Sequence, residues 1–129
     1  MKKNIYFLAF IVLGLLMLGG CRTSPVLNID DAPIAITGKY TMKDVEKAII
    51  RAGVSLGWQM RPKEPGRIEG TLYLRTHMAK IDIMYDKSKY SIRYKDSKNL
   101  NYDGTNIHSN YNGWIQRLNQ TIQAQLTGM

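Results

Sequence analysis

Alternation of apolar and polar residues in the middle of the chain constrains its fold more than any other feature of the sequence. Three successive segments, residues 68–76, 77–85 and 90–94, carry apolar or small side chains at every second position. These positions are Ile68, Gly70, Leu72 and Leu74, then Ala79, Ile81, Ile83 and Tyr85, then Tyr90, Ile92 and Tyr94. A period of two predicts β-strands, and the short turns between them predict an antiparallel meander.

Further strands are expected before these three. Residues 58–61 alternate in the same way, and the turn sequence Glu64-Pro65-Gly66-Arg67 follows them. Proline sets the first central φ of a type II turn, and glycine accepts the positive second one. A short strand over residues 33–37 completes a predicted sheet of about four to five strands.

Two amphipathic helices are predicted, one on each side of the meander in the sequence. The apolar face of the first consists of Val45, Ala48, Ile49, Ala52 and Leu56. Thr41 is its expected N-cap, Asp44 occupies the capping-box position, and Gly57 is its expected end. The apolar stripe of the second consists of Trp114, Ile115, Leu118, Ile122 and Leu126. Asn110 or Asn112 is expected to cap it.

The order strand, helix, meander, helix predicts an α+β fold over residues 33–129. Two helices against one antiparallel sheet make a two-layer arrangement. This order resembles helix-grip and TATA-binding-protein-like domains, including those in a lipoprotein of the outer-membrane β-barrel assembly machine. The resemblance is one of topology and involves no shared motif.

An apolar run precedes the predicted domain. Residues 1–4 are basic, residues 5–18 are almost purely apolar, and Gly19 and Gly20 follow. A charged start, an apolar middle and small residues before a cleavage site are typical of a secretory signal peptide. A membrane-spanning helix is the alternative, but it needs about 20 apolar residues and this run is shorter. We therefore expect residues 1–20 to be removed on export.

The run ends in Leu18-Gly19-Gly20-Cys21, which resembles the lipobox of bacterial lipoproteins. The resemblance implies cleavage between Gly20 and Cys21, a diacylglycerol on the Cys21 sulfur and an acyl chain on its new amino group. Gly19 stands where alanine or serine is more common. Cys21 is the only cysteine in the chain, and lipidation explains an odd cysteine in an exported protein. Several acyl chains together make a durable anchor.

The residue after the cysteine indicates which membrane holds the protein. In lipoproteins of two-membrane bacteria, aspartate at this place resembles a signal for retention in the inner membrane. This chain has Arg22 there, which implies the outer membrane, with the domain on its periplasmic face. Residues 21–32 are polar without a sustained period and are expected to form a short lipidated tether.

Charge narrows the class of partner. The formal net charge is +8 for the whole chain, and Lys2 and Lys3 leave with the signal peptide. Export argues against nucleic acid as the partner. Anionic lipid head groups, anionic wall polymers or an envelope protein are nearer candidates. The alternative is that the lysines and arginines only solvate the surface.

The sequence shows no pattern that predicts a catalytic or metal site. His77 and His108 are the only histidines, and neither has a second ligand at metal-binding spacing. No serine lies in a G-x-S-x-G turn. The carboxylates considered as a catalytic pair are Glu64, Glu69, Asp82 and Asp86, which lie at turns or on expected solvent faces of strands. We predict no catalytic residue, no metal and no cofactor beyond the acyl chains on Cys21.

Tyrosines and arginines around the last strands are the candidate binding surface. They are Tyr73, Arg75, Tyr90, Arg93, Tyr94 and Tyr102. Such side chains suit a sugar polymer, a peptide or a partner protein. The alternative is that these tyrosines only make cross-strand pairs within the sheet.

The sequence therefore predicts a non-catalytic interaction or accessory module of the cell envelope. A lipoprotein that holds a lipid or another small hydrophobic ligand between helix and sheet is the alternative. An envelope hydrolase comes third.

Overall fold

The structure is a computed structural model, and it describes residues 22–129. The predicted signal peptide, the lipobox and Cys21 lie outside the described residues. The described chain folds into strands β1 (Thr23–Pro25) and β2 (Ile29–Pro33), helix α2 (Met42–Ser55), and strands β3 (Gln59–Glu64), β4 (Arg67–Leu74), β5 (His77–Tyr85), β6 (Lys89–Lys98) and β7 (Asn106–His108), followed by helix α3 (Ser109–Thr127). Strands β2 to β6 form one antiparallel sheet in the order β2-β6-β5-β4-β3, and β1 pairs with β7.

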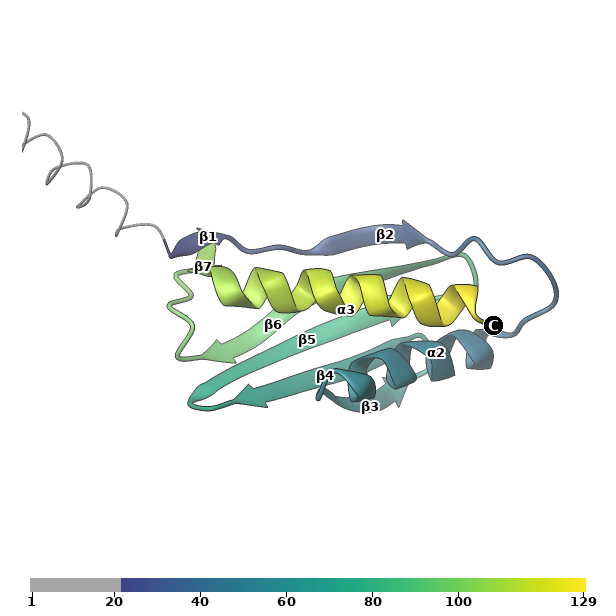
Figure 1. Cartoon of the computed structure of the whole chain (residues 1–129), viewed down its shortest axis with the longest axis horizontal. Helices are drawn as coiled ribbons and strands as arrows, with labels where there is room; N and C mark the ends of the chain where they lie inside the picture. Colours follow the sequence, from purple (N-terminus) through teal and green to yellow (C-terminus); the bar gives the residue numbers. More distant parts are fainter. Residues whose placement is uncertain (1–21) are drawn as a thin grey trace, which may run out of the picture.

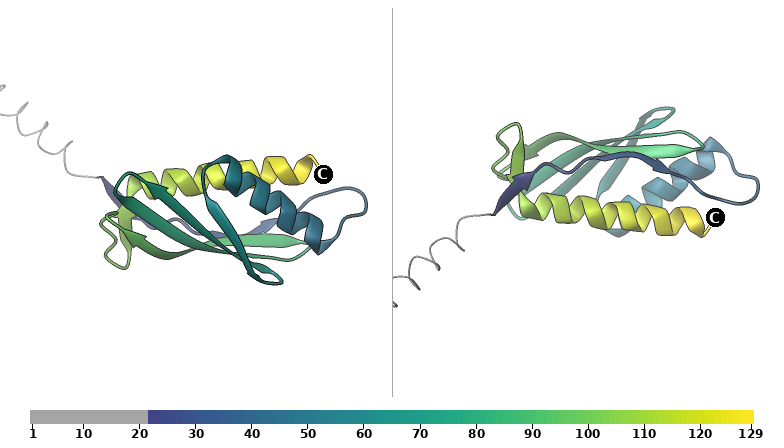
Figure 2. Two further views of the ribbon diagram at one scale, coloured as in Figure 1. Left: turned by 90° about the horizontal axis from the view of Figure 1, so that it is seen from below. Right: turned by 90° about the horizontal axis from the view of Figure 1, so that it is seen from above.

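Both described helices pack on one face of the five-stranded sheet (Figure 1, Figure 2). The predicted two-layer α+β fold is therefore confirmed. Helix α2 lies over β3, where Gly53 allows close contact with Met60. Helix α3 lies over β6, and the Tyr90 hydroxyl donates to Asn119 Oδ1 at 2.5 Å. The space between helices and sheet is filled by fully buried side chains, among them Ile49, Ile68, Ile81, Ile83, Ile92, Ile115 and Leu118.

Helix α2 begins where its sequence predicts. The Thr41 hydroxyl accepts a hydrogen bond from the Asp44 N–H at 3.1 Å, and Asp44 Oδ2 accepts one from the Thr41 N–H at 2.8 Å. This capping box satisfies two of the backbone donors that a helix start leaves free. After the helix, Gly57 has a φ of +91°, which glycine adopts without a Cβ clash.

The predicted antiparallel meander is present. Ile68 lies opposite Ile83, and Ile83 lies opposite Ile92, so these side chains meet on the helix-covered face. Gly66 has a φ of +88° in the turn between β3 and β4, as the turn sequence predicts. Leu74 departs from the pattern, because it lies at the end of β4 and is exposed.

Residues 23–25 and 29–33 form strands β1 and β2, so the prediction of a tether over residues 21–32 is wrong there. The strand predicted over residues 33–37 lies earlier in the chain, at residues 29–33. Thr23 lies opposite His108, and Ala32 lies opposite Tyr90. Asp31 has a φ of +51°, and the register shifts between Ile29 and Ala32. This irregularity breaks the alternation that identifies a strand.

The start of α3 also differs from the prediction. His108 is the N-cap, and its Nδ1 accepts a hydrogen bond from the Asn110 N–H at 3.2 Å. Asn112 instead holds the N-terminal segment, because its Oδ1 accepts from the Leu27 N–H at 2.8 Å and its Nδ2 donates to the Pro25 carbonyl at 2.9 Å. Four of the five residues of the predicted apolar stripe of α3, Ile115, Leu118, Ile122 and Leu126, are buried, and Trp114 is partly buried against the core.

Candidate functional site: the open face of the sheet

The sheet face opposite the helices, which we call the open face, carries a transverse row of charged side chains. Arg61 of β3 lies opposite Glu69 of β4. Asp82 of β5 lies opposite Glu69 on one side and Arg93 of β6 on the other. At the end of the row, Arg93 Nη2 lies 2.8 Å from Asp30 Oδ1. Because directly opposed residues share a face, these charges line one surface.

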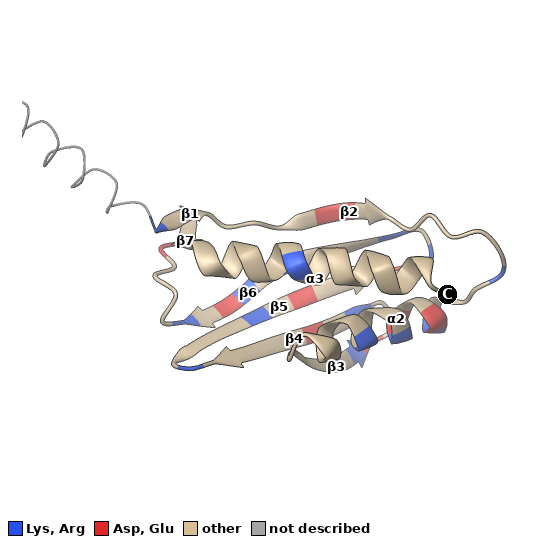
Figure 3. Cartoon of the chain, in the orientation of Figure 1, with Lys and Arg blue, Asp and Glu red and all other residues tan. Residues whose placement is uncertain are grey.

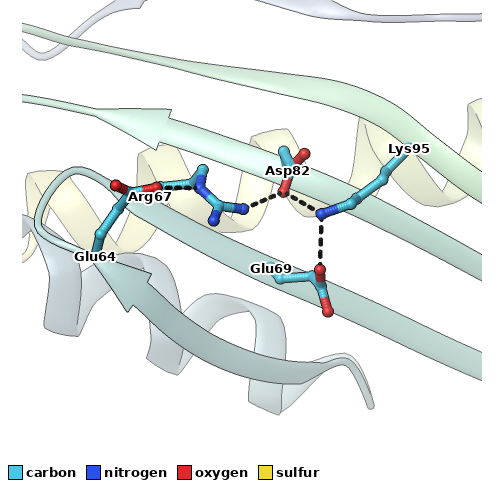
Figure 4. A network of polar contacts seen from close by, with 5 residues as sticks. All are labelled: Glu64, Arg67, Glu69, Asp82 and Lys95. Carbon is cyan, nitrogen blue, oxygen red and sulfur yellow. Dashed lines mark hydrogen bonds and ion pairs between the residues drawn. The ribbon is translucent and has the colours of Figure 1, made fainter.

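A network of ion pairs joins the middle strands of the open face (Figure 4). Arg67 Nε lies 2.7 Å from Glu64 Oε1, and Arg67 Nη1 lies 3.2 Å from Asp82 Oδ1. Lys95 Nζ lies 2.9 Å from Glu69 Oε2 and 3.5 Å from Asp82 Oδ1. Two cations therefore surround the two central carboxylates and fix them to β4, β5 and β6.

The Glu69–Lys95 pair changes the acidity of both groups. The hydrogen bond from Lys95 lowers the pKa of Glu69, and the same bond raises the pKa of Lys95. The Glu69 side chain keeps only 15% of its surface exposed. Glu69 is therefore a structural carboxylate held in its ionised form, unlike a general acid, whose pKa has to be raised.

A stability prediction follows from the lowered pKa of Glu69. A carboxyl group whose folded pKa lies below its unfolded value of about 4.3 stabilises the fold above that pH, and the contribution disappears as pH falls through the folded pKa. Glu69→Gln is expected to lower the free energy of unfolding by about 0.5–1 kcal/mol at neutral pH. Once pH has fallen below the folded-state pKa of Glu69, the variant and the original protein are expected to be equally stable.

Urea denaturation of both proteins across this pH range measures the effect. Glu64→Gln is the matched control, because the Glu64 side chain is 62% exposed, and its stability is expected to stay close to that of the original protein. A stability difference for Glu69→Gln that stays constant from neutral to acid pH would contradict the ion-pair explanation.

Some cations of the open face have no such partner. Arg61, Lys80 and Lys98 form no ion pair within residues 22–129. Asp96 lies opposite Lys80, and its Oδ1 accepts a hydrogen bond from the Ser97 N–H at 2.8 Å. Arg61, Lys80 and Lys98 therefore contribute positive charge to this face that no ion pair of residues 22–129 offsets. Figure 3 shows acidic and basic positions interspersed along β4, β5 and β6.

The six residues of the predicted binding surface do not form one site. Tyr90 is only 1% exposed and points toward α3, so the prediction that it belongs to a binding surface is wrong. Arg93 lies on the open face, and Tyr73 lies near its end with 64% of its surface exposed. Arg75 lies in the turn between β4 and β5.

Tyr94 and Tyr102 are the two members of this set that meet. Their ring centroids lie 4.1 Å apart, and the Tyr94 ring lies 5.7 Å from the buried ring of Tyr111. The Tyr111 hydroxyl is buried and has no hydrogen-bond partner among the described residues. Burial raises the pKa of Tyr111, so its hydroxyl stays protonated. This aromatic cluster holds the loop between β6 and β7 against the start of α3.

The residues considered for catalysis or metal binding make structural contacts. His77 Nδ1 lies 2.7 Å from the Asn99 carbonyl oxygen, and His108 caps α3. Asp86 Oδ1 accepts hydrogen bonds from the Ser88 and Lys89 N–H groups. In the part of the chain that the structure describes, no group of three or more His, Cys, Asp or Glu side chains is placed to hold a metal ion.

Open depressions also lie on the surface, outside the packed space between helices and sheet. One of about 340 Å³ is bordered by Ile36, Tyr40, Lys47 and Arg51, and one of about 390 Å³ by Met42, Lys43, Pro62 and Lys63. Lysine ammonium groups at both rims make poor surroundings for an apolar ligand. The first depression therefore does not resemble the largely apolar pockets in which proteins hold small hydrophobic molecules.

Comparison of the chain with protein-family models, with curated proteins and with solved structures finds no match to any of them. In the part of the chain from Arg22 onwards, no helix is both long enough and apolar enough to span a membrane. The function therefore has to be inferred from the N-terminal motif and from the surfaces of the domain.

Proposed function

We propose that the protein is a bacterial lipoprotein, held at the periplasmic face of the outer membrane by acyl chains on Cys21. Its domain is a non-catalytic binding module for an acidic surface of another envelope protein. The observation that carries this proposal is the open face, a sheet surface on which Arg61 and Lys80 form no ion pair with another residue of the range 22–129, beside the carboxylates of Glu69 and Asp82, which are paired with cations.

The anchor is supported by the sequence. The apolar run followed by Leu18-Gly19-Gly20-Cys21 has the layout of a lipoprotein signal, and the chain has no second cysteine with which Cys21 could form an internal disulfide. Acyl chains on Cys21 would hold the domain at the membrane. Without them, only the surface of the domain itself could contact the bilayer.

The open face suits a protein partner with carboxylates. Complementary charge steers association and selects partners. The strands hold Arg61 and Lys80 in fixed positions on β3 and β5, and the network around Asp82 keeps the surface between them in place. A rigid surface loses little conformational freedom when it binds.

The other two functions have less support. A hydrophobic ligand would need space between the helices and the sheet, and this space is occupied by buried isoleucine, leucine and alanine side chains. A hydrolase would need a free nucleophile or a free pair of carboxylates, whereas Glu69 and Asp82 are each bound to cations.

Charge reversal on the open face tests the proposed binding. Arg61→Glu combined with Lys80→Glu is expected to reduce partner recovery after cross-linking in intact cells by about ten-fold, because both attraction and steering are reversed. The matched control is Lys47→Glu combined with Arg117→Glu, which changes net charge equally on the exposed surface of α2 and α3. The control is expected to recover the partner as the original protein does.

The outcomes separate the three functions. Equal loss in both double variants would show a response to net charge alone and would contradict the open face as the binding surface. No loss in either would also contradict it. A hydrolytic activity that disappears on changing His77 or His108 would favour the hydrolase instead.

A further inference from the structure

The first described residue is fixed directly to the domain. The Ser109 N–H donates a hydrogen bond to the Arg22 carbonyl at 2.8 Å. Thr23 then pairs with His108, and the Val26 N–H donates to the Thr105 carbonyl at 2.9 Å. Cys21 is bonded to Arg22, so no flexible tether separates the proposed lipid anchor from the folded domain.

Two other segments lie at the same end of the molecule, which we call the anchor end. It comprises Arg22, the turn between β4 and β5, and the loop between β6 and β7. Asn99 Nδ2 donates to Thr76 Oγ1 at 2.7 Å, and the His108 N–H donates to the Leu100 carbonyl at 2.8 Å. Figures 1 and 2 show these segments at the same end of the molecule as β1.

The anchor end exposes apolar side chains. Tyr73 is 64% exposed, Leu74 is 46% exposed and Tyr102 is 40% exposed. Tyr73 and Leu74 end β4, and Tyr102 lies in the loop after β6. Tyrosine has an apolar ring and a polar hydroxyl, and it is enriched at the boundary between lipid and water.

Cations accompany these side chains. Arg22 precedes β1, Arg75 lies in the turn after Leu74, and Lys98 is the last residue of β6. None of the three forms an ion pair with another residue of the described chain. Exposed apolar residues with adjacent cations are typical of surfaces that lie on anionic membranes.

We propose that the anchor end lies in the head-group region of the bilayer, with Tyr73, Leu74 and Tyr102 at the interface. Arg22, Arg75 and Lys98 face the lipid phosphates. This inference depends on the proposed lipidation of Cys21. The rigid connection through Arg22 brings this end to the bilayer, and the strands then run away from the membrane with the open face directed sideways.

Single introduced cysteines report how close each end of the domain lies to the bilayer. Because Cys21 is acylated in the proposed state, an introduced cysteine is the only free thiol. The full-length protein is made in bacteria, purified in its lipidated form and placed in vesicles of phosphatidylethanolamine and phosphatidylglycerol. Tyr73→Cys and Tyr102→Cys probe the anchor end, and Lys39→Cys and Lys87→Cys probe loops at the other end of the sheet. Each thiol carries an environment-sensitive fluorophore.

Labels at positions 73 and 102 are expected to be quenched by nitroxide lipids several-fold more than labels at positions 39 and 87. Tyr102 packs on Tyr94, so a label at Leu74→Cys provides an independent third position. Arg75→Glu combined with Lys98→Glu is expected to reduce this quenching in anionic vesicles and to leave it unchanged in neutral ones.

Equally weak quenching at all positions, with the protein still bound to the vesicles, would overturn this orientation and leave the proposed anchor intact. Failure to bind the vesicles at all would contradict both. Protection of the labels in cells but not in pure lipid vesicles would assign the anchor end to a protein partner and would also overturn the inference.

Discussion

Replacement of Cys21 by serine is expected to move the protein from the membrane fraction to the soluble periplasmic fraction almost completely. The sulfur is the proposed attachment point of the diacylglycerol, and each methylene buried in the bilayer contributes about 0.8 kcal/mol. The anchor end alone offers three exposed apolar side chains, which is far less buried surface than acyl chains provide. Loss of the chains therefore outweighs any remaining contact.

The design has to remove the apolar run as well, because an uncleaved signal peptide would itself retain the variant in the membrane. The Cys21→Ser variant is therefore exported behind the cleavable signal of a soluble periplasmic protein, and intact mass confirms that the processed chain begins at the introduced serine. The control is the original protein with its own signal peptide. Unchanged membrane retention of the correctly processed variant would contradict the lipid anchor.

Tyr90→Ala is expected to lower the free energy of unfolding by about 3–5 kcal/mol, enough to unfold a small domain of marginal stability. The Tyr90 ring is 1% exposed between β6 and α3. Its hydroxyl donates to Asn119 Oδ1, so the substitution leaves both a cavity and an amide without its partner. Guanidinium denaturation followed by circular dichroism measures the loss.

Tyr73→Ala is the matched control for Tyr90→Ala. The sequence places both residues in one predicted binding surface, but Tyr73 is exposed at the end of β4. Its removal is expected to change stability by less than about 0.5 kcal/mol. Tyr90→Phe is expected to cost about 1 kcal/mol, because it removes the hydrogen bond and keeps the ring. A stable Tyr90→Ala protein would show that the ring does not hold α3 on the sheet.

Local patterns predict the elements whose contacts are close in sequence. The capping box of α2 joins Thr41 and Asp44, three residues apart. The meander is visible because each strand pairs with the next one along the chain and one face of it is buried. The same alternation places Tyr90 in phase with Ile92 and Arg93 out of phase, which is the signal for their opposite faces.

The N-terminal strands could not be predicted, because their partners are distant and their burial is slight. Thr23 pairs with His108, and the Asn112 side chain secures the segment between β1 and β2. Asp31 has a left-handed backbone conformation and interrupts β2. A polar, irregular segment with such partners has the composition of a tether, and only the folded chain shows that it is held in place.

The candidate site could be predicted only in part. The alternation gives Glu69, Asp82 and Arg93 a solvent-facing side, but the residues that meet across strands depend on register, including the shift between the Lys80 and Ile81 pairs. That shift brings Lys95 over Glu69 and Asp82. This geometry decides which cations of the described chain form no ion pair, and the sequence alone does not show it.

The central claim is that the open face is the binding surface of an envelope-anchored protein. A photo-cross-linking amino acid in place of Gln59 tests this claim in intact cells. Gln59 of β3 is exposed and lies opposite Thr71 of β4. The same amino acid at Gln116, exposed on α3, is the matched control. We predict a protein adduct of defined mass from position 59 that is lost with Arg61→Glu and absent from position 116. Identical adducts from both positions, or none from position 59, would contradict the claim.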